Sequence, residues 1–206
     1  MTAKLILTSI LFTLLQPSVS AVAADKRYPD WPCPQLKVPE LSIAATWPGF
    51  VPENTASSAE QYPGLNNIVV RLAARRTPVE DAEEQISEFV AGTPAEKQAK
   101  AQALFTGLFD ALNAQRFQVM NGIERAYRKQ KEFAEKIRLD TAKLREFQDS
   151  RRDEARLQEL IQQVEWERRI FEERRKMMTY ACEVPVHIDQ RLFALARVIQ
   201  KAAGTS

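Results

Sequence analysis

The stretch that decides the fold runs from Phe105 to Phe147 and reads FTGLFDALNAQRFQVMNGIERAYRKQKEFAEKIRLDTAKLREF. Its residues recur at alternating spacings of four and three, and ten of the thirteen positions in this first series are apolar. Because the series continues over six heptads, it indicates a coiled-coil seam rather than the broader apolar face of a globular helix. The series is Phe105, Phe109, Leu112, Arg116, Val119, Ile123, Ala126, Gln130, Phe133, Ile137, Asp140, Leu144 and Phe147.

Three polar residues interrupt this seam: Arg116, Gln130 and Asp140. Polar side chains inside a seam weaken it but specify its register and its oligomeric state. We therefore expect these three residues to fix how the long helix pairs with its partner, and we assign them no catalytic role.

A second, weaker series follows the charged break Gln148–Arg156 and is out of phase with the first. If residues i and j face each other when i + j = 301, Leu144 meets Leu157 and Val119 meets Cys182. One register in seven brings the two series together, and the midpoint of this one falls inside the break. The pattern therefore favours an antiparallel hairpin. The second series is Leu157, Ile161, Val164, Arg168, Phe171, Arg175 and Met178.

A continuous helix is the alternative to the hairpin. The break contains no glycine or proline, so it carries little of the usual turn chemistry. A stutter could instead carry one helix of about 90 residues through the break. That helix would expose its seam, and it would need a second copy of the chain as a homodimer partner.

Further helices are predicted on both sides of the long stretch. Thr77 and Thr93 each precede a proline and stand three residues before a glutamate, which is the capping-box pattern of a helix start. We also expect a last helix to begin after Pro185, because proline interrupts a helix. These helices and the first part of the long one form a predicted head, residues 61–118 plus 183–203.

The predicted fold is all-α, a small helical bundle head with a long antiparallel coiled-coil hairpin, preceded by a proline-rich extended segment. We assign residues 1–24 to a signal peptide and residues 25–60 to an extended strap. The head follows, and the hairpin occupies residues 119–182. A mature chain of about 180 residues suits one domain with an extension.

The N-terminus has the pattern of a secretory signal. Lys4 supplies the basic region, Leu5 to Leu15 supply an apolar core of 11 residues, and small residues end the stretch at Ala24. That core is shorter than the roughly 20 residues that a membrane-spanning helix needs. We therefore expect a cleaved leader and a periplasmic or secreted protein.

Export to an oxidising compartment bears on the two cysteines of the chain. Cys33 and Cys182 are the only possible pair, 149 positions apart, and an oxidising compartment favours a disulfide between them. A loop of that size would stabilise the fold by about 5 kcal/mol in the chain-entropy model. Two separate buried thiols remain the alternative. The bond would fasten the strap, in which six of the 11 prolines fall between Pro29 and Pro52, to the base of the hairpin.

The composition excludes several kinds of chemistry. One histidine cannot build a His-rich metal site, and a net charge of +2 gives no electrostatic case for nucleic acid. His187 has acidic neighbours, but no catalytic or phosphate-binding motif surrounds it. We predict no catalytic residues, no cofactor and no metal site. Arg151 and Arg152 at the expected tip would attract an anionic membrane only weakly.

Five residues are candidate contacts for a protein partner: Trp31, Trp47, Arg151, Arg152 and Trp166. The first two lie in the strap, where packing on the protein's own domain is the competing interpretation. Trp166 lies off the predicted seam, and an exposed indole is a common anchor of an interface. Packing under neighbouring arginine side chains is the competing interpretation. The chain as a whole is predicted to be a non-enzymatic exported adaptor or scaffold. A holdase-type chaperone and an auxiliary subunit of an exported enzyme are the alternatives.

Overall fold

The computed structural model describes residues 25–47, 61–150 and 153–204. The predicted signal segment, part of the predicted strap (residues 48–60) and Arg151 and Arg152 lie outside these ranges. The described residues form helices without a β-strand, as the sequence predicts. The helices are α1 (Ile43–Thr46), α3 (Leu65–Ala73), α4 (Val79–Val90), α5 (Pro94–Ser150) and α6 (Glu154–Ala203).

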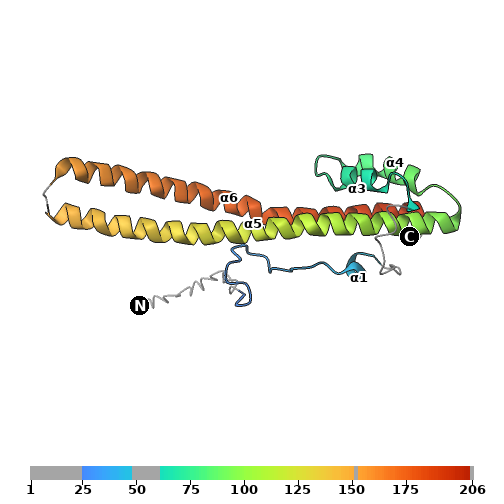
Figure 1. Ribbon diagram of the computed structural model, residues 1–206, viewed down its shortest axis with the longest axis horizontal. Helices are drawn as coiled ribbons and strands as arrows, with labels where there is room; N and C mark the ends of the chain where they lie inside the picture. Colours follow the sequence, from blue (N-terminus) through green and yellow to red (C-terminus); the bar gives the residue numbers. More distant parts are fainter. Residues whose placement is uncertain (1–24, 48–60, 151–152, 205–206) are drawn as a thin grey trace, which may run out of the picture.

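The two long helices form the predicted antiparallel hairpin within one chain. Helix α6 runs back along α5 from the connection at one end of the molecule (Figure 1). Asp153 caps the start of α6, since its carboxylate accepts a hydrogen bond from the Arg156 backbone amide at 3.0 Å. This cap at the start of α6 therefore compensates for the absence of glycine and proline from the break. The alternative of one continuous helix through the break is therefore wrong.

The predicted register is confirmed near the middle of the hairpin. The Gln130 side-chain amide donates to the Phe171 carbonyl at 2.9 Å, and 130 and 171 sum to 301. The second series needs a correction, however, because Arg168 is exposed and Glu167 is buried in its place. A cation from the facing helix compensates the Glu167 carboxylate, whereas the longer arginine side chain keeps its charge in water.

The head packs on one side of the hairpin. Helices α3 and α4 lie against the start of α5 and the end of α6 (Figure 1). Gly107 permits the close approach of α3, because a Cβ there would lie 2.9 Å from a Val69 methyl group. The Arg191 guanidinium donates to the Leu72 carbonyl at the end of α3. The largest fully buried core side chains include Leu72, Ile86, Leu104, Phe105, Leu108, Leu112, Ile188, Leu192, Leu195 and Ile199.

The two predicted capping boxes differ in the structure. Thr93 forms its box, because the Glu96 carboxylate accepts from the Thr93 backbone amide at 2.8 Å at the start of α5. Thr77 does not cap α4, whose first residue is preceded by Pro78 with no side-chain cap. The Thr77 hydroxyl instead donates to the Arg71 carbonyl at 3.0 Å. The tight connection between α3 and α4 uses this side chain to close the earlier helix.

The predicted helix break at Pro185 is wrong, because α6 continues through this residue. A proline inside a helix costs about 3 kcal/mol through the lost amide donor and the ring's clash. Pro185 is buried, and core residues that include Ile188 follow it directly. A strap side chain, Gln35, donates to the nearby Cys182 carbonyl. Burial of the proline beside the core offsets part of this cost.

Candidate partner-binding surfaces

The predicted disulfide joins the strap to the hairpin at a region that we call the neck, residues 112–131 of α5 and 171–189 of α6. Cys33 and Cys182 are bonded, with Cα atoms 5.5 Å apart. Both cysteines are buried in a small cluster with Ile123, and Trp31 packs against this cluster. The alternative of two separate thiols is therefore wrong.

A buried arginine holds the strap beside the disulfide. The Arg116 guanidinium donates to the Val38 and Pro39 carbonyls and forms an ion pair of 2.7 Å with Asp189. Burial raises the pKa of Asp189 above its ordinary value of 3.8, and the Arg116 charge opposes that rise. This polar residue of the predicted seam therefore fixes three elements, namely the strap, α5 and α6.

Ion pairs fasten the rest of the strap to α5. Lys37 contacts Glu124 at 2.6 Å, and Asp30 contacts Lys131 at 2.6 Å and Arg128 at 3.2 Å. The hydrogen bond from Lys131 is the main cause that lowers the pKa of Asp30. Within residues 25–47, the strap is thus held by ion pairs at Asp30 and Lys37 as well as by the disulfide.

The two strap tryptophans, predicted as candidate partner contacts, face the protein's own interior. Trp47 is 5% exposed and stacks on Phe105 with ring centroids 4.5 Å apart. Trp31 is partly buried, and its indole N–H donates to the Gln35 carbonyl at 2.7 Å. Trp47 is therefore part of the hydrophobic core, as the competing interpretation of packing on the protein's own domain expects.

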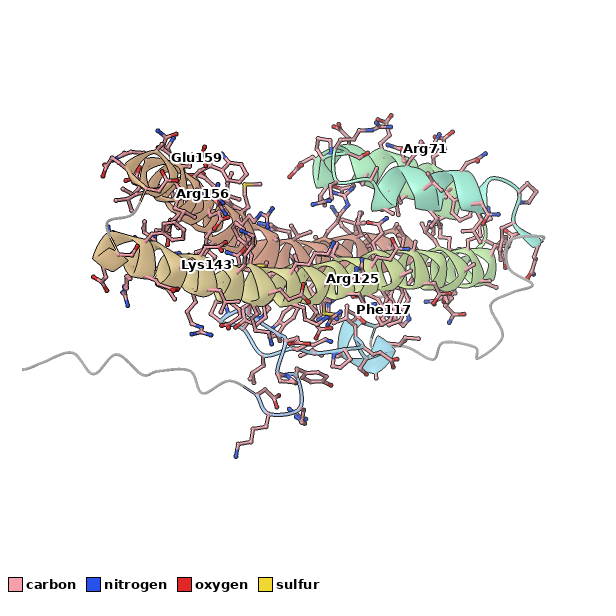
Figure 2. All side chains as sticks on the ribbon, turned by 60° about the vertical axis from the view of Figure 1, so that its left-hand side comes forward. Arg71, Phe117, Arg125, Lys143, Arg156 and Glu159 are labelled. Carbon is pink, nitrogen blue, oxygen red and sulfur yellow. A yellow bond between two sulfur atoms is a disulfide. The ribbon has the colours of Figure 1, made fainter. Side chains whose placement is uncertain are left out.

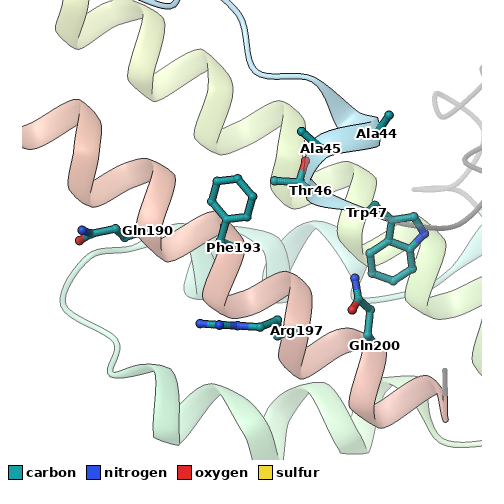
Figure 3. Close-up of a pocket in the computed structure, with 8 residues that line it drawn as sticks. All are labelled: Ala44, Ala45, Thr46, Trp47, Gln190, Phe193, Arg197 and Gln200. Atoms are coloured by element: carbon teal, nitrogen blue, oxygen red, sulfur yellow. The ribbon is translucent and has the colours of Figure 1, made fainter. Parts of the chain in front are cut away.

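A hollow of about 500 Å³ opens beside Trp47 (Figure 3). Phe193 and Arg197 of α6 form one side of it, and the short helix α1 forms the other. Trp47 lines this hollow, and residues 48–60, which follow it in the chain, lie outside the described ranges. We therefore assign no ligand to the hollow.

A further predicted contact, Trp166, lies in a region that we call the arm, which comprises residues 132–150 of α5 and 154–170 of α6. Trp166 is 61% exposed there. Arg151 and Arg152 lie outside the described residues. Charged side chains cover the arm, including Lys143 on α5 and the pair Arg156 and Glu159 on α6 (Figure 2).

A polar layer interrupts the seam of the arm. Asp140 and Glu167 are both buried there, and the Lys136 ammonium contacts both carboxylates. Lys143 contacts Asp140 at 3.1 Å and Gln163 donates to Glu167 at 3.0 Å. The hydrogen bond from Lys136 is the main cause that lowers the pKa of Asp140. Asp140 thus has the register-fixing position that the sequence predicts, with Glu167 as a partner that the pattern missed.

An open apolar groove of about 620 Å³ crosses the neck between α5 and α6. We call it the neck groove. Its more buried lining includes Val119, Ile123, Met178, Ala181, Val184 and one polar residue, Gln130, and its exposed lining includes Ala126, Met177 and three cations, Arg75, Lys129 and Arg174. The sequence analysis missed this site. Its signal is a set of small residues at the neck, but Arg75 reaches it from a connection that only the fold brings near.

The described residues bring together no group of three His, Cys, Asp or Glu side chains that could hold a metal ion. His187 is exposed, and its Nδ1 lies 3.3 Å from the Gln190 side-chain oxygen. Across the same residues, no helix combines the length and the apolar character needed to cross a membrane. No protein-family model, curated protein or solved structure matches this chain.

Proposed function

We propose that this protein is an exported, non-enzymatic adaptor or scaffold that binds another protein through its arm. The observation that carries the proposal is the isolation of the arm. Among the described residues, no hydrogen bond, ion pair or core cluster joins the arm to the strap, α3 or α4. Residues 132–150 of α5 extend about 28 Å at 1.5 Å per residue. A projection of this length, supported only by its own hairpin, presents surface to a partner without disturbing the head.

The disulfide supports the export part of the proposal. Disulfides between distant positions persist in oxidising compartments and are rare in the reducing cytosol. Cys33 and Cys182 form such a bond, and the sequence begins with the pattern of a secretory signal. Both features agree with a periplasmic or secreted site of action.

Trp166 is the residue that we assign to the contact. Tryptophan is enriched among the residues that dominate binding energy at interfaces. Its indole is 61% exposed in the middle of the arm, where the surface around it is charged. An apolar anchor inside a polar rim is the usual anatomy of an interface.

A site-specific crosslinking experiment tests the proposal. A photo-crosslinking amino acid replaces Trp166 in one variant and Glu173 in the control. Glu173 is also exposed and lies one heptad further along α6, inside the neck. In cells of the source organism, we expect a single discrete adduct from position 166 and none from position 173. Adducts of equal yield at both positions, or none at either, would contradict the proposal.

A binding comparison then separates an adaptor from a holdase. Once the crosslinked partner is identified, Trp166→Ala should weaken the binding of that partner to this protein by about tenfold or more. The helical circular dichroism signal and the melting temperature should stay unchanged. A holdase would instead suppress the aggregation of chemically reduced insulin, with no dominant adduct. That outcome would replace the adaptor with the chaperone alternative.

A further inference from the structure

The neck groove combines an apolar floor with a cationic border. Val119, Ile123 and Met178 are among its more buried lining residues, and the neighbouring Ala126 leaves the space open because its side chain is short. The described part of the strap, residues 25–47, and the α3–α4 pair lie on opposite sides of the hairpin (Figure 1), and no residue of that part lines the groove. The groove borders the α3–α4 connection through Arg75, and its floor residues Ile123 and Met178 also pack against the disulfide cluster. Its lining residues all lie outside the arm.

The charges around the groove all have one sign. Arg75, Lys129 and Arg174 line it, and no aspartate or glutamate does. Arg174 lies over the Phe133 ring at 4.9 Å. Within the part of the chain that the structure describes, none of the three forms an ion pair with a carboxylate. Three cations without acidic partners next to an apolar surface favour a ligand that carries a negative charge.

The size of the groove selects among anionic ligands. Its volume of about 620 Å³ lies within the range of roughly 300–1,000 Å³ typical of small-molecule sites, which are mostly apolar with a few polar groups. Twelve residues line it, whereas a standard protein interface uses roughly 20–30 residues on each side. Met177 and Met178 can adapt to a flexible chain because their side chains are unbranched.

We propose that the neck groove binds one single-chain anionic amphiphile of the fatty-acid class, with its alkyl chain on the apolar floor and its carboxylate among the three cations. Inorganic phosphate would leave the apolar floor uncovered, and a neutral hydrocarbon would leave the cations without a counterion. An anionic amphiphile satisfies both parts of the surface. This site is independent of the partner contact proposed for Trp166.

Calorimetric titration of the full chain tests the ligand class. The probes are laurate, dodecyltrimethylammonium and dodecanol, each kept below its micelle or solubility limit. We expect laurate to bind with one-to-one stoichiometry and at least tenfold more tightly than the cationic and neutral probes. Equal binding of all three probes, or no binding of laurate, would overturn the proposal.

Two neighbouring arginines supply a matched test of the charge. Arg75 lines the groove and Arg76 does not, although both are exposed at the end of α3. Arg75→Glu should weaken laurate binding about fivefold or more, because it removes an attractive charge and adds a repulsive one. Arg76→Glu should leave the affinity within about twofold, as expected for a charge further from the ligand. An equal loss in both variants would contradict a local site.

A filling variant tests the position of the alkyl chain. Ala126→Trp should abolish laurate binding, whereas Ala155→Trp, at an exposed alanine of the arm, should not. Circular dichroism melts of both variants show that the hairpin is intact. Anionic phosphatidylglycerol vesicles distinguish a free amphiphile from a membrane surface, because flotation with vesicles without binding of monomeric laurate would overturn the proposal. Crosslinking at Trp166 should be unchanged by Ala126→Trp, so the two proposals can fail separately.

Discussion

The neck and the arm are built from the same two helices but are held together by different forces. At the neck, the disulfide, the Arg116–Asp189 ion pair and the strap that packs on both helices hold α5 against α6. In the arm, only a narrow seam with the Asp140 and Glu167 layer joins them. The helical pattern alone is therefore enough to pair the two helices, while contacts from distant parts of the chain reinforce that pairing at the neck.

Loss of the disulfide should have the largest effect on this contrast. We expect Cys33→Ser with Cys182→Ser to lower the free energy of unfolding by about 5 kcal/mol in the chain-entropy model, since the bond closes a loop of 149 residues. Urea unfolding followed by circular dichroism measures it. A reducing agent should produce the same loss in the wild type and no change in the double variant. A stability difference below about 1 kcal/mol would show that the strap does not depend on the bond.

A matched pair of leucines compares the packing of the two regions directly. Leu112 at the neck is fully buried, whereas Leu144 in the arm is only partly buried. We expect Leu112→Ala to cost about 3 kcal/mol and Leu144→Ala to cost about 1 kcal/mol, because the first leaves a cavity that the surroundings cannot fill. Thermal unfolding of the two variants measures the difference. Equal costs would mean that the arm is packed as tightly as the neck.

The sequence alone could predict the hairpin because a heptad seam is a local pattern with a fixed period. The sum of 301 that relates Gln130 to Phe171 follows from that period. Pro185 could not be predicted in this way, because its tolerance depends on burial beside the core, which is set by distant parts of the chain. Glu167 was missed because the second series was followed at fixed spacing through Arg168, and the cation that compensates Glu167 lies on the other helix.

The binding surfaces were harder to predict than the fold, for a related reason. The exposure of Trp166 follows from its place off the seam, but that of Trp47 depends on where the strap lies. The neck groove needs Arg75 from one element and Ala126 from another to meet in space. Periodicity predicts which residues share a helix face, and it does not predict which distant connection will cover that face.

Removal of the buried cation should have an intermediate effect that is confined to the neck. Arg116→Ala should lower the free energy of unfolding by about 2 kcal/mol, because it leaves the Asp189 carboxylate without its partner. Solvent reaches Asp189 and makes this loss smaller than for a fully buried carboxylate. The double variant Arg116→Met with Asp189→Leu should recover most of this stability. Urea midpoints of the three proteins measure the coupling. A double variant no more stable than Arg116→Ala would show that the cost comes from the lost bonds to the strap carbonyls and not from the unpaired Asp189 carboxylate.

The pH dependence of two aspartates should be the smallest effect and the sharpest separation of the two regions. The pKa of Asp140 in the arm is lowered by its hydrogen bond from Lys136, so its stabilising contribution is present above about pH 3.8 and is lost as the pH falls through its folded pKa. The pKa of Asp189 at the neck is raised by burial, so the folded state gains stability as the pH falls through that higher value. Carbon-13 NMR titration of the two carboxyl groups should therefore show Asp140 titrating below 3.8 and Asp189 above it. In Asp140→Asn, acidification below pH 3.8 should remove less stability than in the wild type, and an unchanged acid profile would show that the arm does not depend on this carboxylate.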